Sequence, residues 1–420
     1  MKRGFFTIMA AQFFSSLADN ALLIAAIALL IEMHAPDWMK PLLKLFFTIS
    51  YVVLAPFVGA FADSMPKGQV MFVTNTIKVG GCLLMFFTLH PLLAYAVVGF
   101  GAAAYSPAKY GILTELLPPE KLVVANGWIE GTTVSSIILG TVLGGALISP
   151  AVSSMLLSLD LPMIDTGVDT PAEAAILIIS LVYIVAAVFN LRIPDTGARY
   201  PHQVRNPIRL VREFAHCFMV LWKDKLGQIS LAVTTLFWGA GATLQFIVLE
   251  WAKTALKLPL NKAAILQGVV AIGIAVGAAA AARYIPLKGS LRVLKVGVAM
   301  GLLVPLMTLV SNQGMAYPLL VLIGALAGFF VVPMNALLQH RGHVLMSAGH
   351  SIAVQNFNEN LNVLLMLGLY AGLLRLNLHI NWIIAIFGIF VAASMLLVIR
   401  RHQANQRRFD SVSLIGEGGH

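Results

Sequence analysis

The sequence has 420 residues, of which 59% are hydrophobic and only 11% are charged, and its formal net charge is +10. Soluble domains carry about 25% charged residues, so this chain has too few charges to cover a water-facing surface. The composition therefore excludes an ordinary soluble enzyme and predicts a polytopic membrane protein.

Apolar runs recur along the chain, and a helix needs about 20 mostly apolar residues to cross a bilayer. The first run follows the basic start of the chain, but it contains Asp19 and lacks a clear small-residue cleavage site, so we interpret it as a retained span rather than a secretory signal. The predicted spans are residues 5–31, 41–62, 69–89, 91–113, 121–149, 172–192, 229–253, 261–284, 290–311, 315–339, 349–375 and 380–400. The sequence thus predicts twelve helices in two groups of six.

Lys and Arg gather on one side of these spans. If the N-terminus is cytoplasmic, 20 of the 28 fall on the inside, six on the outside and two within spans. The longest outside loop, 150–171, instead carries three aspartates. The positive-inside rule then places both termini in the cytoplasm. The basic surplus is a topology signal, part of which meets anionic membrane lipids, and it gives no support to nucleic-acid binding.

Six spans, a basic linker and six more spans are typical of the major facilitator fold, in which substrate binds between two pseudo-symmetric six-helix halves. A weak internal repeat supports this fold, because Pro107-Ala108-Lys109 in span four has a counterpart in Pro333-Met334-Asn335 of span ten. The predicted domains are an N-terminal bundle, a cytoplasmic linker, a C-terminal bundle and a polar tail: residues 1–192, 193–228, 229–400 and 401–420.

Two short motifs add to the resemblance to this superfamily. Gly59 to Asp63 followed by Lys67-Gly68 is similar to its G-x-x-x-D signature with a following basic residue. Asp63 at a helix end can accept hydrogen bonds from a neighbouring helix N-terminus and, with Lys67, latch the halves on the inside; the alternative is a charged loop beside a span. Gly140-x-x-x-Gly144 in span five indicates either another superfamily motif or close helix packing.

Asp19 and Asn20 lie near mid-depth of span one, where a charge is costly. Span one lines the central cavity of this fold. Asp19 is therefore predicted to grip a cationic headgroup, to bind a coupling proton or sodium ion, or to form an ion pair. A purely structural pair is the alternative.

Lys109 follows Pro107, which kinks span four near its inside end. A lysine is a suitable point charge for a phosphate. Glu130 in span five lies at a similar depth. Two interpretations stay open, a structural Lys109–Glu130 bridge or contact with substrate.

Further polar residues gather in the spans of the second half, which predicts a wet cavity rather than isolated interhelical contacts. They are Trp238, Gln245, Asn335, Gln355, Asn358 and Glu359. The sequence has no Walker-type glycine loop, no H-E-x-x-H motif and no catalytic serine or cysteine constellation. We therefore predict a transporter without a metal or cofactor, and not an enzyme.

Several stretches resemble the bacterial lysophospholipid transporter family of the major facilitator superfamily. They are Asp19 to Leu23, Gly101 to Gly111, Phe237 to Gly241, Val332 to Gln339 and Ala353 to Asn356. The resemblance implies a flippase that moves lysophosphatidylethanolamine and lysophosphatidylglycerol from the outer to the inner leaflet of the Gram-negative inner membrane. It also implies functional coupling to an acyltransferase–acyl-carrier-protein synthetase on the cytoplasmic side, expected here as a separate partner.

Two other functions fit the same polar residues. The main alternative is a proton-coupled exporter of drugs or small amphiphiles that uses Asp19 or Glu359 to bind the proton. The other is a non-transporting scaffold that presents lysolipid to an acyltransferase.

Overall fold

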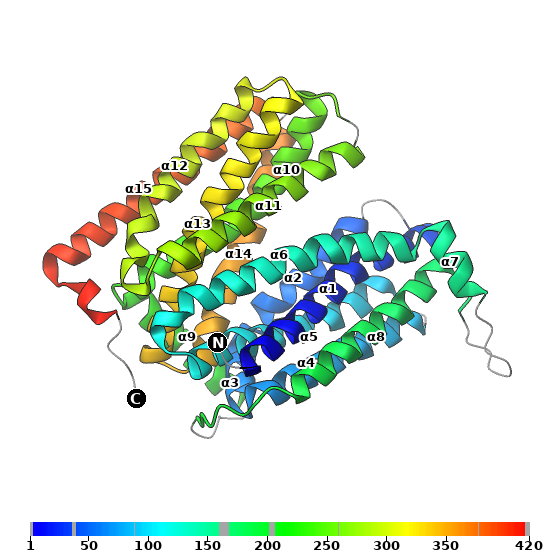
Figure 1. The fold of residues 1–420 in the computed structure, drawn as a ribbon, viewed down its shortest axis with the longest axis horizontal. Coiled ribbons are helices and arrows are strands. Elements are labelled where there is room, and N and C mark those ends of the chain that lie inside the picture. Colours follow the sequence, from blue (N-terminus) through cyan, green and yellow to red (C-terminus); the bar gives the residue numbers. More distant parts are fainter. Residues whose placement is uncertain are drawn as a thin grey trace. The chain divides into compact units, whose positions relative to one another are not determined.

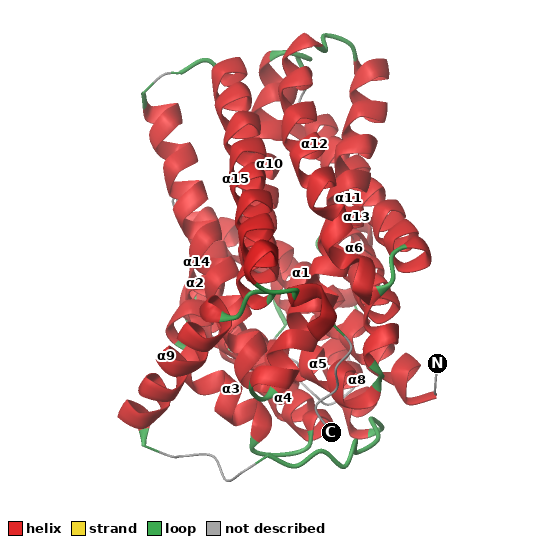
Figure 2. Ribbon diagram, turned by 90° about the vertical axis from the view of Figure 1, so that its left-hand side faces the viewer, coloured by secondary structure: helices red, strands yellow, loops and turns green. Residues whose placement is uncertain are grey.

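The computed structural model describes residues 3–35, 39–87, 89–158, 168–200, 206–258, 260–376 and 378–415. Within these ranges every regular element is a helix, and Figure 2 shows only helices and loops in the described part. This confirms the predicted all-α class.

All six predicted spans of the first half are helical. Their helices are α1 (Arg3–Glu32), α2 (Met39–Val53) with α3 (Ala55–Asp63), α4 (Lys67–Phe86), α5 (Pro91–Leu116), α6 (Leu122–Leu147) after the 3-10 turn η1 (Pro119–Lys121), and α8 (Pro171–Leu191). The second span is broken, because α2 and α3 meet at an angle of 65°. Pro56 at the start of α3 cannot donate a backbone hydrogen bond to the preceding turn, which explains the break.

The six predicted spans of the second half are helical too. They correspond to α10 (Gly227–Thr254), α11 (Leu260–Tyr284), α12 (Leu294–Leu303) between the 3-10 segments η2 (Leu287–Val293) and η3 (Val304–Leu309), α13 (Gln313–Leu345), α14 (Ala348–Arg375) and α15 (Ile380–Arg408). In the described part of the chain, ten helices are long and apolar enough to cross a membrane, and the bent α2–α3 pair makes eleven. The twelfth segment, α14, has 28 residues, about 42 Å at 1.5 Å per residue, so it is long enough to cross a bilayer. It is not among the helices counted above because it contains many polar residues, from Gln355 to Asn362.

The loops hold helices that the sequence did not predict. The predicted outside loop begins with α7 (Pro150–Leu157), the linker contains α9 (Pro207–Lys223), and the last helix continues to Arg408 before the short turn η4 (Ser411–Leu414). Asp160 and Asp165 of the predicted outside loop lie outside the described residues.

In the linker, Arg199 donates to Asp195 at 2.6 Å, and this bond lowers the pKa of the exposed Asp195 to about 2.

The chain forms two compact units. One contains Met1–Ile112 and Ser135–Val211, and the other contains Leu113–Val134 and Arg212–His420. The first half of α6 therefore belongs to the second unit, whereas the predicted bundles follow chain order. The division at residues 192 and 229 stays a prediction.

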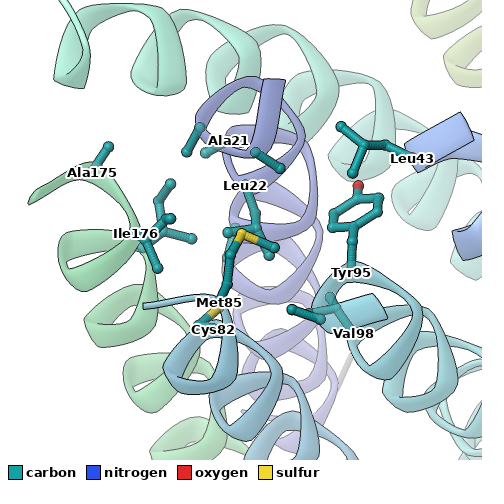
Figure 3. Packing of buried hydrophobic residues seen from close by; sticks show 14 of the residues in the cluster. Ala21, Leu22, Leu43, Cys82, Met85, Tyr95, Val98, Ala175 and Ile176 are labelled. Carbon is teal, nitrogen blue, oxygen red and sulfur yellow. The ribbon is translucent and has the colours of Figure 1, made fainter. Parts of the chain in front are cut away.

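In the first unit, α8 packs along α1 and α4 (Figure 1). Leu22 of α1, Cys82 and Met85 of α4, Tyr95 of α5 and Ile176 of α8 share one buried apolar cluster (Figure 3). This cluster holds α1, α4, α5 and α8 together, and two of these helices carry Asp19 and Lys78.

Helix α1 also lies very close to the second half of α6. A Cβ atom at Gly140 would meet the Leu17 carbonyl oxygen at 2.5 Å, and one at Gly144 would meet the Ala21 carbonyl oxygen at 2.7 Å. No larger residue fits there without a shift of the backbone. The small residues of the Gly140-x-x-x-Gly144 motif thus allow close helix packing.

Candidate functional site

Asp19 of α1 forms an ion pair with Lys78 of α4 inside the first unit. The Lys78 Nζ atom lies 2.9 Å from Asp19 Oδ1 and 3.0 Å from Oδ2. The lysine side chain is 1% exposed and the aspartate side chain 21%. Of the interpretations left open for Asp19, the structure shows the ion pair, and the aspartate is the more accessible partner.

Hydroxyl groups and aromatic rings complete this site. Tyr183 of α8 donates to Asp19 Oδ1 at 2.6 Å, and Lys78 donates to the Ser15 hydroxyl at 3.0 Å. Ser15 in turn donates to Asn75 Oδ1 at 2.8 Å. The Lys78 ammonium also lies 5.0 Å from the ring centroid of Tyr105. A buried ion pair needs such additional hydrogen bonds to offset the loss of hydration.

The sequence pointed to Asp19 but not to its partners. Lys78 had a readable signal, because it is a lone charge inside an apolar span and a charge at that depth needs a counter-ion. Ser15 and Tyr183 had none, since such residues are common in spans. Asn20, the predicted neighbour of Asp19, donates instead to the Ser16 carbonyl of its own helix at 2.8 Å.

A second polar site lies in the second unit and joins α6, α13 and α14. Asn335 donates to Glu130 Oε1 at 3.4 Å, and Gln355 donates to Asn335 Oδ1 at 3.1 Å. Gln355 also lies 2.7 Å from Glu359 Oε1, one helical turn further along α14. All four side chains are buried. The structure thus brings together four residues that the sequence predicted on three separate spans.

One turn from this site, Asn126 of α6 and Gln339 of α13 exchange two hydrogen bonds, each 2.9 Å long. Both side chains are almost fully buried. This reciprocal amide pair was not among the predicted site residues. Its sequence signal was the four-residue spacing to Glu130 and Asn335, which places each amide on the same helix face as the predicted residue.

Asn358 belongs to a different contact. Its Nδ2 atom donates to the Val354 carbonyl at 2.7 Å, and its Oδ1 atom accepts from the Trp222 indole of α9 at 3.3 Å. Asn358 therefore connects α14 to the linker helix, and in the contacts that the structure describes it does not join Gln355 and Glu359.

Trp238 and Gln245 of α10 lie away from the amide–carboxylate site in their described contacts. The Trp238 ring stacks edge-on against Phe237 at 5.5 Å. Gln245 is exposed and donates to Gln267 of α11 at 2.9 Å, and Gln267 donates back to the Gln245 carbonyl at 3.0 Å. Gln267 is a partner that the sequence did not indicate.

Lys109 of α5 is half-buried and lies beside an aromatic ring. The Lys109 ammonium lies 4.3 Å from the Tyr110 ring centroid. Lys109 belongs to the first compact unit and Glu130 to the second, so a bridge between them stays a prediction.

Asp63 and Lys67 form a buried pair. Lys67 Nζ lies 2.5 Å from Asp63 Oδ1 and 2.8 Å from the Ala62 carbonyl oxygen. The pair joins the end of α3 to the start of α4, and its role as a latch stays a prediction.

The second unit also contains an ion pair, in which the arginine is buried and the aspartate side chain is 11% exposed. Arg341 near the end of α13 contacts Asp224, with an Nη2–Oδ1 distance of 2.7 Å and an Nε–Oδ2 distance of 3.2 Å. Asp224 also accepts from the backbone N–H of Gly227 at 2.7 Å, so it caps the start of α10.

In the described ranges, no three His, Cys, Asp or Glu side chains are placed to share a metal ion.

The sequence of this chain is similar to those of known membrane transporters. The sequence model of the Major Facilitator Superfamily matches residues 8–361. Lysophospholipid transporter LplT of Yersinia enterocolitica is 45% identical over 381 residues, which cover 90% of this chain and 89% of that protein. This chain belongs to the lysophospholipid transporter family of the major facilitator superfamily. LplT of Yersinia pestis strain Pestoides F, another member of the lysophospholipid transporter family, is 45% identical over 377 residues.

Solved structures agree with the fold of this lysophospholipid transporter family member. A bacterial homologue of the iron transporter ferroportin in its outward-facing state superposes with a TM-score of 0.71 at 15% identity, covering 97% of this chain and all of that one. The superfamily transporter FucP in its outward conformation gives a TM-score of 0.71 at 13% identity, with 94% and 98% covered. At these identities the likeness concerns the fold alone, and it confirms the predicted major facilitator fold.

Proposed function

We propose that this protein moves lysophospholipids across the bacterial inner membrane by alternating access. The observation that carries the proposal is the 45% identity to lysophospholipid transporters over 90% of the chain. The buried polar pairs inside otherwise apolar helices support it. A lysophospholipid has a charged head and a single acyl chain, so its carrier needs polar groups beside apolar walls.

In the first unit, the Asp19–Lys78 pair supplies the polar group. Asp19 is the partner with accessible surface, and its Oδ1 atom is held by Tyr183. An ion pair offers both signs of charge at one place, which suits a head that carries a phosphate together with an amine or a glycerol. Ala18, Ala21 and Leu22 beside Asp19 on α1 are buried in the apolar cluster, so packing against neighbouring helices holds this part of α1 in place.

In the second unit, Glu359 and Gln355 of α14 with Asn335 and Glu130 supply a second set of acceptors and donors. Amides hydrogen-bond to phosphate and hydroxyl groups in either orientation, so they accept heads that differ in charge. We propose that Lys109 contributes a cation for the phosphate and that the two sites contact the head in alternating states.

The proposed cellular setting follows from the charge distribution and the substrate. We place the protein in the Gram-negative inner membrane with both termini in the cytoplasm. We propose that lysolipid that reaches the inner leaflet is then re-acylated by an acyltransferase–acyl-carrier-protein synthetase on the cytoplasmic side.

The test is transport of lysophosphatidylethanolamine in spheroplasts that lack an endogenous transporter. The chain, its Asp19→Asn variant and an Asp195→Asn control are expressed to equal levels. Asp195 is an exposed linker carboxylate, so the control removes the same charge outside the spans. Uptake and re-acylation restored by the chain and by the control, but not by Asp19→Asn, support the proposal.

Other outcomes separate the alternatives. Proton-dependent efflux of amphiphilic dyes without lysolipid movement would assign the protein to the exporters. Binding of lysolipid without flux in either direction would assign it to the scaffolds. Full transport by the Asp19→Asn variant would show that the headgroup site lies elsewhere.

A further inference from the structure

The linker helix α9 lies between two membrane helices. It follows α8, which ends at Leu191, and it ends at Lys223, so that only three residues separate it from the start of α10 at Gly227. Because α8 and α10 end and begin at the same side of the predicted bilayer, the linker is tied to that surface at both ends. The linker therefore begins and ends beside that predicted surface.

One side of α9 packs against the protein. The Phe214 ring lies 5.5 Å from the Phe357 ring of α14, and the Phe218 ring lies 6.2 Å from it, both edge-on. Leu221 is fully buried and Trp222 donates to Asn358. This packed side fixes the rotation of the helix about its axis.

A second side of α9 is apolar and exposed. It consists of residues spaced by three, four and four positions, which lie within about 80° of one another on a helix of 3.6 residues per turn. They are Ile208, Val211, Ala215 and Met219. Ile208 is 75% exposed and Met219 is 49% exposed. We call these four residues the apolar strip.

Directly beside the apolar strip runs a row of exposed basic residues. They are Arg209, Arg212, His216 and Lys223, spaced by three, four and seven positions. The helix contains one acidic residue, Glu213. We call these four residues the basic row. An apolar strip flanked by basic residues is the pattern of helices that lie in a membrane interface.

We propose that α9 is an interfacial helix that binds the anionic phospholipid headgroups of the bilayer surface. The basic row contacts the lipid phosphates, and the apolar strip inserts among the upper parts of the acyl chains. The charge of the row fits an anionic surface, and the position of the helix between two spans puts that surface within reach. Through Phe357 and Asn358, α9 also holds the segment of α14 that carries Glu359.

The test places a fluorescent thiol label on the full-length protein in lipid nanodiscs. Met219→Cys on the apolar strip is compared with His216→Cys on the basic row, both with Cys217→Ser; Cys82 is fully buried and does not react. The nanodiscs contain phosphatidylcholine with brominated acyl chains, with or without phosphatidylglycerol. We expect quenching at position 219 to exceed that at 216 several-fold and to increase with phosphatidylglycerol.

A charge variant tests the headgroup contact. We expect Arg209→Gln/Arg212→Gln/Lys223→Gln to remove the phosphatidylglycerol dependence of quenching at position 219. The matched control Lys288→Gln/Arg292→Gln/Lys295→Gln removes three exposed cations from η2 and the start of α12, on the same predicted side, and is expected to retain that dependence. Thermal unfolding verifies that both variants are folded.

Two results would overturn the proposal. Equal and weak quenching at positions 216 and 219 would show that the strip does not enter the bilayer and would leave it to a protein partner. Equal loss of the phosphatidylglycerol dependence in both charge variants would show a general effect of net charge. Because these readouts do not use transport, they stand whether or not lysolipid is the substrate. The consequence for α14, a lower transport rate without anionic lipid, rests on the proposed function.

Discussion

The ammonium of Lys78 lies 2.9 Å from Asp19 Oδ1 and joins α4 to α1 in the apolar interior of the first unit. Neither charge is stable alone at that depth, because an unpaired charge in a membrane helix costs at least about 2.5 kcal/mol. The pair therefore places an accessible carboxylate inside a membrane protein. This relationship determines the first prediction.

Lys78→Met leaves Asp19 without its counter-ion and is expected to abolish transport and to destabilise the protein by about 3–5 kcal/mol, as for the loss of one partner of a buried pair. The double variant Lys78→Met/Asp19→Leu removes both charges. We expect the melting temperature of the double variant in detergent to return most of the way to that of the unmodified protein. We expect no transport by this variant. Transport by the double variant would show that the pair is structural only.

Tyr183→Phe removes the hydroxyl that donates to Asp19 Oδ1 at 2.6 Å while keeping the ring beside Lys78. Hydrogen bonds to charged groups contribute about 1.5–3 kcal/mol. We expect a folded protein with a lower transport rate, because the Asp19 carboxylate loses the hydrogen bond that fixes its orientation. Initial rates of lysolipid uptake measured at several concentrations verify this, and an unchanged rate would contradict it.

Asn126 and Gln339 exchange two buried hydrogen bonds, so their contributions to stability depend on each other. In a double-mutant cycle we expect Asn126→Ala and Gln339→Ala each to lower the melting temperature, because each leaves a buried amide without a partner. The melting temperature of the double variant is expected to be no lower than that of the less stable single variant. Strictly additive losses would show that the two amides do not interact.

Arg341 and Asp224 form a largely buried ion pair, and Asp224 also accepts from the backbone N–H of Gly227 at the start of α10. Arg341→Gln is expected to destabilise the protein by about 3–5 kcal/mol, since it leaves the carboxylate buried without a cation. Arg292→Gln, which removes an exposed arginine, is the control and is expected to have little effect. Comparable melting temperatures for the two variants would contradict the importance of the pair.

Amino-acid composition and pattern determined the fold class and the path of the chain. The twelve apolar runs are helical because a backbone in hydrocarbon has to satisfy its own hydrogen bonds, and that requirement can be read from local sequence. The same physics marked Asp19, Glu130 and Glu359, since charges within spans are rare.

Tertiary structure alone decided which polar groups meet. Asp19 pairs with Lys78 and Tyr183, which lie 59 and 164 positions away in the chain, and Asn358 faces the linker helix instead of Glu359. Such pairings depend on how helices pack and rotate about their axes, and a single sequence gives neither. The linker helix α9 likewise escaped prediction, because its amphipathic pattern is too short and too basic to be recognised as a span.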